Sequence, residues 1–232
     1  MITILLQAIS LLGIALAAAQ AGPLSTDWPD PTTNNIAVTP LTAEEEGDLL
    51  HMREEEKLAG DVYTALYDQW GLPVFANIAA AERTHASAVL TLLDRYGLAD
   101  PAAGNPPGVF TDPELQALYD RLLARGGQSL ADALYAGATI EEVDIVDLQE
   151  ALNRTTKADI TAVYTNLLRG SGNHLRAFVS QWEQTTGQTY TPQVLSAAAF
   201  ETIMTGESGG NGNRRSQGRG PGGRGWANGG RP

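Results

Sequence analysis

Four long segments of this chain carry apolar residues at the three- and four-residue spacing of a helix, and this pattern limits the possible folds most. The segments cover about residues 42–70, 74–96, 129–153 and 156–184. Because successive residues of a helix turn by about 100°, this spacing places the apolar side chains on one face. No segment of the domain alternates apolar and polar residues for the length of a strand. The sequence therefore predicts an all-α fold.

Capping and helix-breaking residues set the limits of the first two helices. Thr42 and Glu45 have the spacing of a capping box, in which each side chain binds the backbone N–H of the other residue. Gly71 and Pro73 end the first helix, and Gly97 ends the second.

The connection between the second and third long helices is much longer than the others. Residues 97–112 consist of turn-forming residues, and a short helix is expected over residues 113–125, with Pro113 at its first position. Another short helix is expected over residues 191–204. Two helix pairs separated by about thirty residues predict a four-helix bundle with one long crossover.

Each of the four apolar faces also carries residues of the types that bind metal ions. A carboxylate buried without a partner costs several kcal/mol, so several carboxylates in one core need a common positive partner that offsets this cost. A pair of divalent cations would supply it, since carboxylates can bridge two cations. The chain has no cysteine, and oxygen and imidazole ligands suit Fe or Mn, and Zn less specifically. The predicted ligands are Glu56, Glu82, His85, Glu141, Asp144 and His174.

Helix phase separates these residues from their neighbours. Glu54 and Glu55 are expected to be solvated, and His51 lies one residue off the apolar face and is left out of the site. Glu141 is preferred to Glu142, because Glu141 continues the apolar face of its helix at spacings of four and seven residues. A bend earlier in that helix would reverse this choice.

A second hypothesis describes a different class of protein. The same residues could form a hydrogen-bonded network in the core of a non-catalytic, envelope-associated bundle that binds partners through its surface or its C-terminal tail. A metal centre requires inward-facing carboxylates on the third long helix, whereas a network protein can expose them. The orientation of Glu141 and Asp144 therefore bears on both hypotheses.

The stretches EKLAGDVY (residues 56–63) and ERTH (residues 82–85) resemble the ferritin-like superfamily, which includes rubrerythrins and bacterioferritins. More closely, REEEKLAGDVY, IEEVDIVDL and GSGNHLRAF are similar to the ferritin-like family catalogued as domain of unknown function 2202. The resemblance covers about residues 41–204. It implies a ferritin-like bundle with a di-iron centre, at which two ferrous ions reduce dioxygen or peroxide.

The resemblance also implies a role for each matching residue. Glu56 would be the terminal ligand of the first helix, and Glu82 would be a bridging carboxylate. His85 and His174 would be the imidazole ligands, and a carboxylate of the IEEVD segment would serve the third long helix. Tyr63 matches a tyrosine of the superfamily, which either hydrogen-bonds a ligand or only packs.

The chain departs from the superfamily pattern at Ser171, where a symmetric centre has a second bridging glutamate. Either Asp144 replaces the missing carboxylate from the third long helix, or the site holds one metal firmly and a second weakly. The substitution puts ferroxidase activity in doubt more than metal binding.

Both ends of the chain differ from the bundle, which is expected over residues 41–205. Residues 1–21 are mainly apolar and end in an A-x-A pattern, which predicts a signal peptide cut after Ala21 and an exported protein. Without cleavage the segment would anchor the protein in a membrane. Residues 22–40 predict a linker. Residues 206–232, with eleven glycines and five arginines, predict a disordered tail.

The tail and the rest of the chain have opposite charges. The chain has 15 basic and 27 acidic residues, of which five and one lie in the tail, so that the tail carries about +4 and the remainder about −16. An acidic domain argues against nucleic-acid binding by the folded part, whereas the tail could contact polyanions. The tail and the export signal favour a monomer or dimer over a ferritin-type cage.

Overall fold

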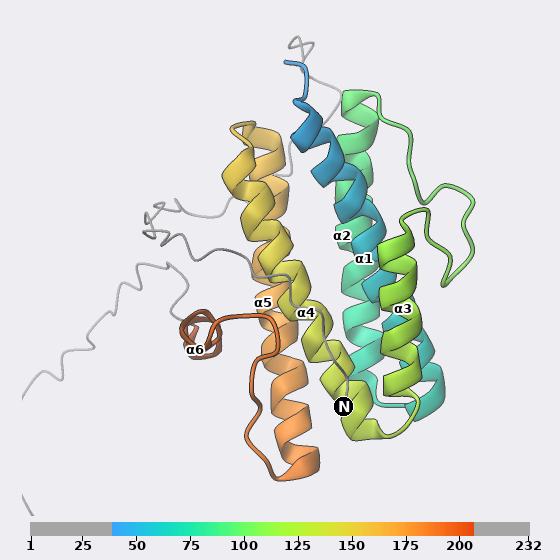
Figure 1. Cartoon of the computed structure of the whole chain (residues 1–232), viewed down its shortest axis with the longest axis vertical. Helices are drawn as coiled ribbons and strands as arrows, with labels where there is room; N and C mark the ends of the chain where they lie inside the picture. Colours follow the sequence, from blue (N-terminus) through green and yellow to red (C-terminus); the bar gives the residue numbers. More distant parts are fainter. Residues whose placement is uncertain (1–38, 207–232) are drawn as a thin grey trace, which may run out of the picture. The chain divides into compact units, whose positions relative to one another are not determined.

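The computed structural model describes residues 39–206, in which all regular secondary structure is helical (Figure 1). The all-α class is therefore confirmed for this part of the chain. The six helices are α1 (Ala43–Trp70), α2 (Pro73–Tyr96), α3 (Pro113–Gly126), α4 (Leu130–Arg154), α5 (Ala158–Thr186) and α6 (Ala197–Thr205).

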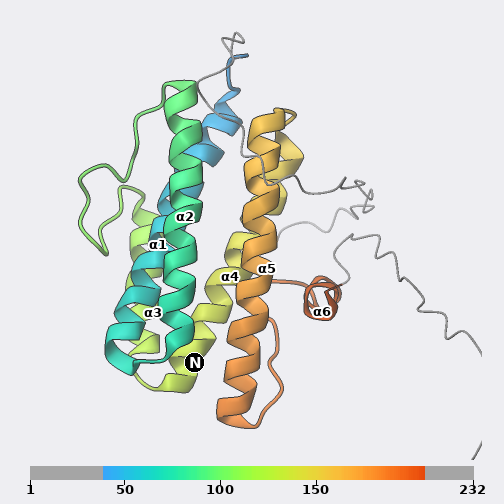
Figure 2. The same ribbon diagram turned by 180° about the vertical axis from the view of Figure 1, so that it is seen from behind.

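The long helices associate as two hairpins. α1 packs along α2, and α4 packs along α5, as Figures 1 and 2 show from opposite sides. The hairpins contact each other through α1 with α4 and through α2 with α5, while α3 lies against α1 and α4. This arrangement leaves four long helices around one core, although the ferritin-like assignment itself stays a prediction.

The limits of the first two helices follow from local chemistry. The Thr42 side chain accepts a hydrogen bond from the Glu45 N–H at 3.1 Å, and the Glu45 carboxylate accepts one from the Thr42 N–H at 3.0 Å, so the predicted capping box is present. Gly71 and Gly97 end α1 and α2 with φ angles of 65° and 72°. These left-handed conformations favour glycine, because it has no Cβ.

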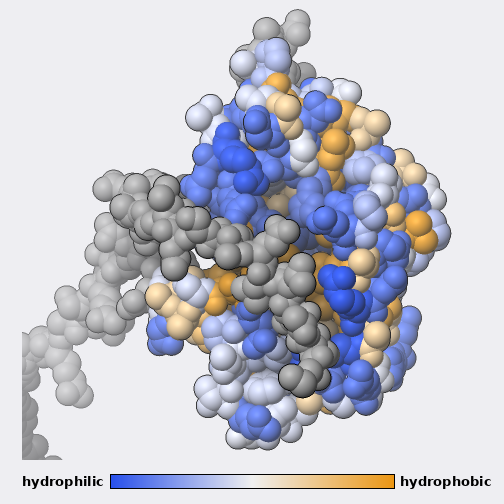
Figure 3. Space-filling model, in the orientation of Figure 1, coloured by the Kyte–Doolittle hydropathy of each residue, from blue (hydrophilic) through white to orange (hydrophobic). Residues whose placement is uncertain are grey.

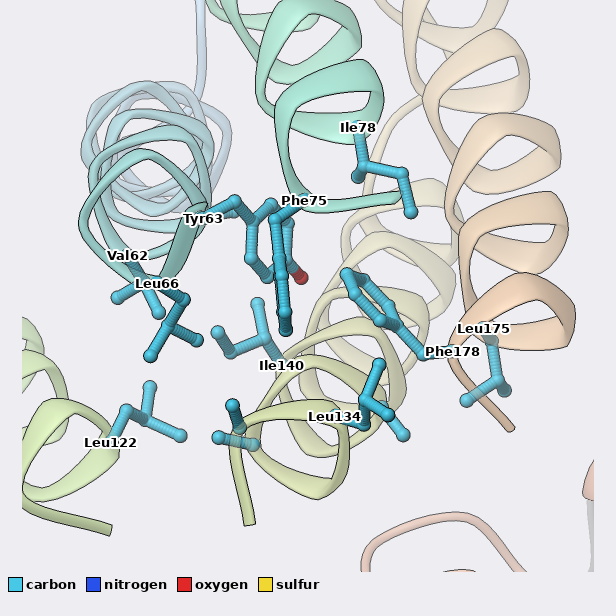
Figure 4. Close-up of a cluster of buried hydrophobic side chains, with 14 of the residues drawn as sticks. Val62, Tyr63, Leu66, Phe75, Ile78, Leu122, Leu134, Ile140, Leu175 and Phe178 are labelled. Atoms are coloured by element: carbon cyan, nitrogen blue, oxygen red, sulfur yellow. The ribbon is translucent and has the colours of Figure 1, made fainter. Parts of the chain in front are cut away.

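Two apolar clusters fill the core at different heights along the helices. The first contains the rings of Tyr63, Phe75 and Phe178, which approach one another from α1, α2 and α5 (Figure 4). The second lies around Leu49 and Leu148. In α1, α2 and α5 the polar residues predicted for the site come between segments that belong to the two clusters, so the site lies in the middle of the bundle.

The last helix begins later than its sequence predicts. α6 starts at Ala197 rather than near residue 191, and Ser196 caps it. The preceding backbone N–H groups of Gln193, Val194 and Leu195 donate to the buried carboxylate of Glu142 at 2.7–2.9 Å. These tertiary hydrogen bonds hold the segment in an extended turn, which overrides its helical periodicity.

Few large hydrophobic side chains are strongly exposed among the described residues. Hydrophilic residues form most of the coloured face in Figure 3. The exposed large hydrophobic side chains within residues 39–206 are Tyr67, Val109 and Val194, which come from separate elements.

Within the same residues, no helix has both the length and the apolar character that crossing a membrane requires. The predicted signal peptide, the predicted linker up to residue 38 and the predicted tail beyond Gly206 lie outside the described residues.

Candidate metal centre

The four long helices bring all six predicted ligands into one buried group, which we call the core cluster. α1 supplies one residue, α2 two, α4 two and α5 one, and the carboxylates are at most 7% exposed. The inward-facing side chains of the four helices meet at the axis of the bundle, so residues that are far apart in the chain come together in its core. The core cluster consists of Glu56, Glu82, His85, Glu141, Asp144 and His174.

Glu82 lies at the centre of the core cluster, with one imidazole beside each of its carboxylate oxygens. Its Oε2 atom is 2.7 Å from Nδ1 of His85, and its Oε1 atom is 2.8 Å from Nδ1 of His174. Nδ1 of His85 is also 3.3 Å from the Glu56 carboxylate, and Nδ1 of His174 is 3.5 Å from that of Glu141. Two groups of three potential ligands therefore share Glu82.

Two of these separations, 3.3 and 3.5 Å, are close to what a shared cation requires, and the two at Glu82, 2.7 and 2.8 Å, are a few tenths of an ångström shorter. Two ligand atoms bound at about 2.1 Å to one transition-metal ion, at angles of 90–110°, lie roughly 3.0–3.4 Å from each other. The four N···O separations around Glu82 span 2.7–3.5 Å. The donor set of carboxylate oxygens and imidazole nitrogens also suits Fe, Mn or Zn. The residues therefore fit a pair of metal ions.

The hydrogen bonding of the core cluster is incomplete, although its atoms are buried. Buried polar atoms in proteins rarely lack a hydrogen-bond partner, because an unpartnered atom has lost its hydrogen bonds to water and gained none in return. No salt bridge within residues 39–206 joins the cluster to a lysine or arginine. The atoms without a hydrogen-bond partner are Glu56 Oε1, Glu82 Oε1, His85 Nδ1, Asp144 Oδ1 and His174 Nδ1.

Asp144 approaches the position at which the superfamily pattern lacks a carboxylate. The Ser171 hydroxyl donates to Oδ2 of Asp144 and also lies 2.9 Å from the carbonyl oxygen of Leu167. Oδ1 of Asp144 has no partner. This placement favours the alternative in which a carboxylate from α4 takes the place of the missing glutamate in α5.

Tyr63 and the two glutamates of α4 have distinct contacts. The Tyr63 hydroxyl donates to Oε1 of Glu141 at 2.6 Å, while the other oxygen of Glu141 faces His174. Of the two roles considered for Tyr63, the structure therefore has the hydrogen-bonding one. Glu142 points away from the cluster and accepts hydrogen bonds from the Tyr190 hydroxyl and from three backbone N–H groups. Glu141 faces the site, as its helix phase indicates.

Burial and mutual charge shift the pKa values of the core cluster in opposite directions. Burial would raise the pKa of Glu82, but the adjacent imidazoles outweigh it and lower this pKa to about 2. Burial and the charge of Glu82 raise the pKa of Glu141 to about 7. Burial raises the pKa of Asp144 to about 7 as well, against the opposing hydrogen bond from Ser171. Burial opposes the rise of the His174 pKa to about 10, which its two carboxylate neighbours cause.

Comparison with known proteins places this bundle in a family. Residues 45–207 match the family described as an uncharacterized protein domain, DUF2202. The chain belongs to the DUF2202 family. It is 46% identical, over 172 residues, to the uncharacterized protein MJ0754 of Methanocaldococcus jannaschii, covering 74% of this chain and 92% of the relative. The crystal structure of the M. jannaschii protein has a TM-score of 0.71, 45% identity, and coverage of 74% of this chain and 98% of that one.

A glycine of the DUF2202 domain makes room for one imidazole of the core cluster. A Cβ atom on Gly170 would lie 2.7 Å from Cε1 and Nε2 of His85. Gly172, by contrast, would meet only Ile203, at the ordinary distance of 3.7 Å. The glycines of α5 thus differ: Gly170 permits the close approach of His85 to the helix, and Gly172 does not need to be a glycine for packing.

Two expectations about α1 of the DUF2202 domain are wrong. Glu54 and Glu55 are only 3% and 2% exposed, because the connection between α2 and α3 and the helix α4 cover their side of α1. Glu54 accepts hydrogen bonds from the N–H groups of Thr111 and Asp112 at 2.5 and 2.9 Å. Glu55 faces His51, which the helix phase had left outside the site.

Proposed function

We propose that the DUF2202 domain of this chain binds one or two transition-metal ions, Fe or Mn, in the core cluster. The observation that carries the proposal is the position of Glu82, whose two oxygens face two imidazoles from different helices. Glu56 and His85 would hold one ion with Glu82. Glu141 and His174 would hold a second ion with Glu82, and Asp144 would add the carboxylate that Ser171 does not provide.

Iron bound at this position would supply one-electron redox chemistry toward dioxygen or peroxide, while the protein would supply orientation and a dry environment. Apolar clusters lie on both sides of the core cluster and bury its carboxylates, while the side chains of His85 and His174 stay 15% and 13% exposed. Tyr63 holds Glu141 in its orientation through a hydrogen bond, as outer residues commonly do for metal ligands.

The carboxylates of α4 would also bind and release protons. Glu141 and Asp144 have pKa values of about 7, so each holds or releases a proton at neutral pH. Cation binding requires both to be deprotonated, so it would release the protons that these two carboxylates hold. Export, a monomeric or dimeric state and contacts of the tail with polyanions are further proposals, which rest on the sequence alone.

Metal analysis of protein purified without a histidine tag tests the proposal. We expect bound iron or manganese, or uptake of up to two Fe(II) per chain in an anaerobic titration. Exposure of the Fe(II)-loaded protein to O2 would then give the absorbance of an oxo-bridged diferric product if both sites fill and react.

The matched variants are Glu82→Gln, which removes the shared carboxylate, and Glu150→Gln, which removes a 49% exposed carboxylate from α4. Uptake should be lost in the first and retained in the second. Folded wild-type protein that is isolated metal-free and fails to bind added Fe(II) or Mn(II) would contradict the proposal and favour the hydrogen-bonded network.

A further inference from the structure

A second group of potential ligands lies outside the core cluster, between α1 and α4. Nε2 of His51 is 3.8 Å from Oε2 of Glu55, one helical turn further along α1. The same nitrogen is 3.6 Å from Oδ2 of Asp147 in α4. One ligand atom from each residue lies within 4.8 Å of the other two. We call His51, Glu55 and Asp147 the outer cluster.

The buried member of the outer cluster lacks a hydrogen-bond partner. Glu55 is 2% exposed, and its Oε2 atom, which faces His51, has no partner within hydrogen-bonding geometry. A carboxylate oxygen buried without a donor is costly in a protein interior. The outer cluster is therefore more than a group of acidic residues on a surface, because it directs an unsatisfied oxygen at an imidazole and a second carboxylate.

The distances suit a bound cation better than direct hydrogen bonds. The separations of 3.6 and 3.8 Å exceed the usual N–H···O range of about 2.7–3.2 Å. Ligand atoms around a tetrahedral transition-metal ion are roughly 3.4 Å apart. The two separations from His51 are within a few tenths of an ångström of that spacing, and the remaining pair, Glu55 and Asp147, has ligand atoms within 4.8 Å, so an ion needs only side-chain adjustments.

The opposite nitrogen of His51 faces another carboxylate. Nδ1 of His51 is 3.5 Å from Oδ2 of Asp112, which lies just before α3. A histidine that binds a metal through one nitrogen commonly directs the other toward a carboxylate, which fixes the orientation of the ring. In the same way, the His51 ring lies between the Asp112 carboxylate on its Nδ1 side and the carboxylates of Glu55 and Asp147 on its Nε2 side.

An ion could reach the outer cluster from solvent. The side chains of His51 and Asp147 are 37% and 35% exposed. Both line a pocket of about 130 Å³, together with Asp48, Met52, Ala151 and Arg154. The core cluster lies near its inner side, because burial raises the pKa of the Glu55 carboxylate and the charges of Asp144 and Glu141 raise it further.

We propose that His51, Glu55 and Asp147 form a second divalent-cation site, through which ions pass from the surface pocket to the core cluster. The ligand class is a borderline transition-metal ion such as Fe(II), Mn(II), Co(II) or Zn(II), since the site combines one imidazole with two carboxylates and has no thiolate. The binding site stands on its own geometry, and only its loading role rests on the proposed function of the core cluster.

Binding is tested with Co(II), whose visible spectrum reports coordination, in a variant that lacks the core site. In Glu82→Gln/His85→Gln protein we expect one Co(II) to bind, and adding His51→Gln should weaken this binding at least about tenfold. Glu150→Gln, a surface change in α4, is the control and should have no effect. No Co(II) binding to the core-deficient variant, or binding that His51→Gln does not change, would overturn the site.

A second measurement uses the intact core, in case the double variant does not fold. His51→Gln alone should bind one Co(II) fewer than wild type at a Co(II) concentration that just saturates the wild-type protein, and an unchanged stoichiometry there would overturn the site. In a stopped-flow experiment, His51→Gln should also slow filling of the core by Fe(II) severalfold and leave its final occupancy unchanged.

An unchanged filling rate would overturn the loading role. If the proposed function itself fails, the core-dependent signal is absent from wild type while the His51-dependent Co(II) signal persists, so the two failures are distinguishable.

Discussion

Two groups of buried glutamates in this molecule have the same chemistry and nearly the same burial, but they are satisfied differently. Glu142 and Glu54 accept hydrogen bonds from backbone N–H groups of distant loops and so attach those loops to the helices. Glu56 and Glu82, in the core cluster, each have an oxygen that accepts no hydrogen bond, although imidazole nitrogens lie nearby. Burial of a carboxylate is therefore no sign of a metal site by itself, whereas incomplete hydrogen bonding next to an imidazole is.

The largest expected effect separates the two groups by stability. Glu142→Ala should lower the free energy of unfolding by roughly 3–5 kcal/mol, because four donors lose their buried acceptor. Urea unfolding in the presence of a chelator measures this change, with Glu150→Ala as the exposed control. The folded variant should still bind metal, and a loss of metal binding in folded Glu142→Ala protein would contradict the division of roles.

The pH dependence of stability should be governed by the core cluster. Glu141, Asp144 and His174 all have pKa values raised in the folded state, so the folded protein binds more protons than the unfolded chain across pH 5–8. Stability of the metal-free protein should therefore be highest near pH 5 and fall as pH rises to 8, by roughly 2–3 kcal/mol for each of these three groups. The lowered pKa of Glu82 acts with the opposite sign, but below pH 4.5.

Thermal unfolding across this pH range, with and without saturating Mn(II), checks the prediction. Manganese should reduce or reverse the fall, because cations displace the protons and bind more tightly at higher pH. A metal-free protein that becomes more stable between pH 5 and 8 would contradict the raised pKa values of Glu141, Asp144 and His174.

Glu141→Gln should have opposite effects on binding and on metal-free stability. It removes a ligand and should lower the affinity for an ion at His174 by roughly 10–100-fold. It also removes a negative charge next to Glu82, so metal-free stability at pH 8 should rise slightly rather than fall. Isothermal titration and urea unfolding measure the two effects, and an unchanged affinity would show that Glu141 is structural like Glu142.

The smallest expected effect concerns the hydroxyl that orients Glu141. Tyr63→Phe removes one buried hydrogen bond and should cost about 1 kcal/mol of stability, since the ring packing with Phe178 is retained. Metal affinity should fall by up to about tenfold. Tyr164→Phe, which removes a buried hydroxyl without a hydrogen-bond partner, is the control: it should leave metal affinity unchanged and should not lower stability.

Local features of the fold were predictable because their causes lie within a few residues in the chain. The capping box joins Thr42 to a residue three positions away, and Gly71 and Gly97 end their helices through their own backbone conformation. The inward positions of Glu56, Glu82 and Glu141 follow from helix phase, which each helix carries in its own sequence. Their convergence follows once the helices form a bundle.

Only the tertiary structure decided the surroundings of the other buried acids. Glu54 was expected in solvent, but its partners are 57 and 58 positions away, in a connection that its helix phase does not reveal. The start of α6 likewise depends on Glu142, which binds backbone groups 51–53 positions further along. The four-residue spacing of His51 and Glu55 can be read from the sequence. The third member of the outer cluster, Asp147, joins them only because α4 packs beside α1.

The sequence by itself thus determined the helical class, the helix limits near α1 and α2, and the carboxylate and imidazole residues on each inward face. The tertiary structure decided which oxygens obtain donors from distant loops and which do not. The physical reason is that periodicity and capping are short-range, whereas hydrogen-bond satisfaction of a buried carboxylate depends on segments that meet it only after folding.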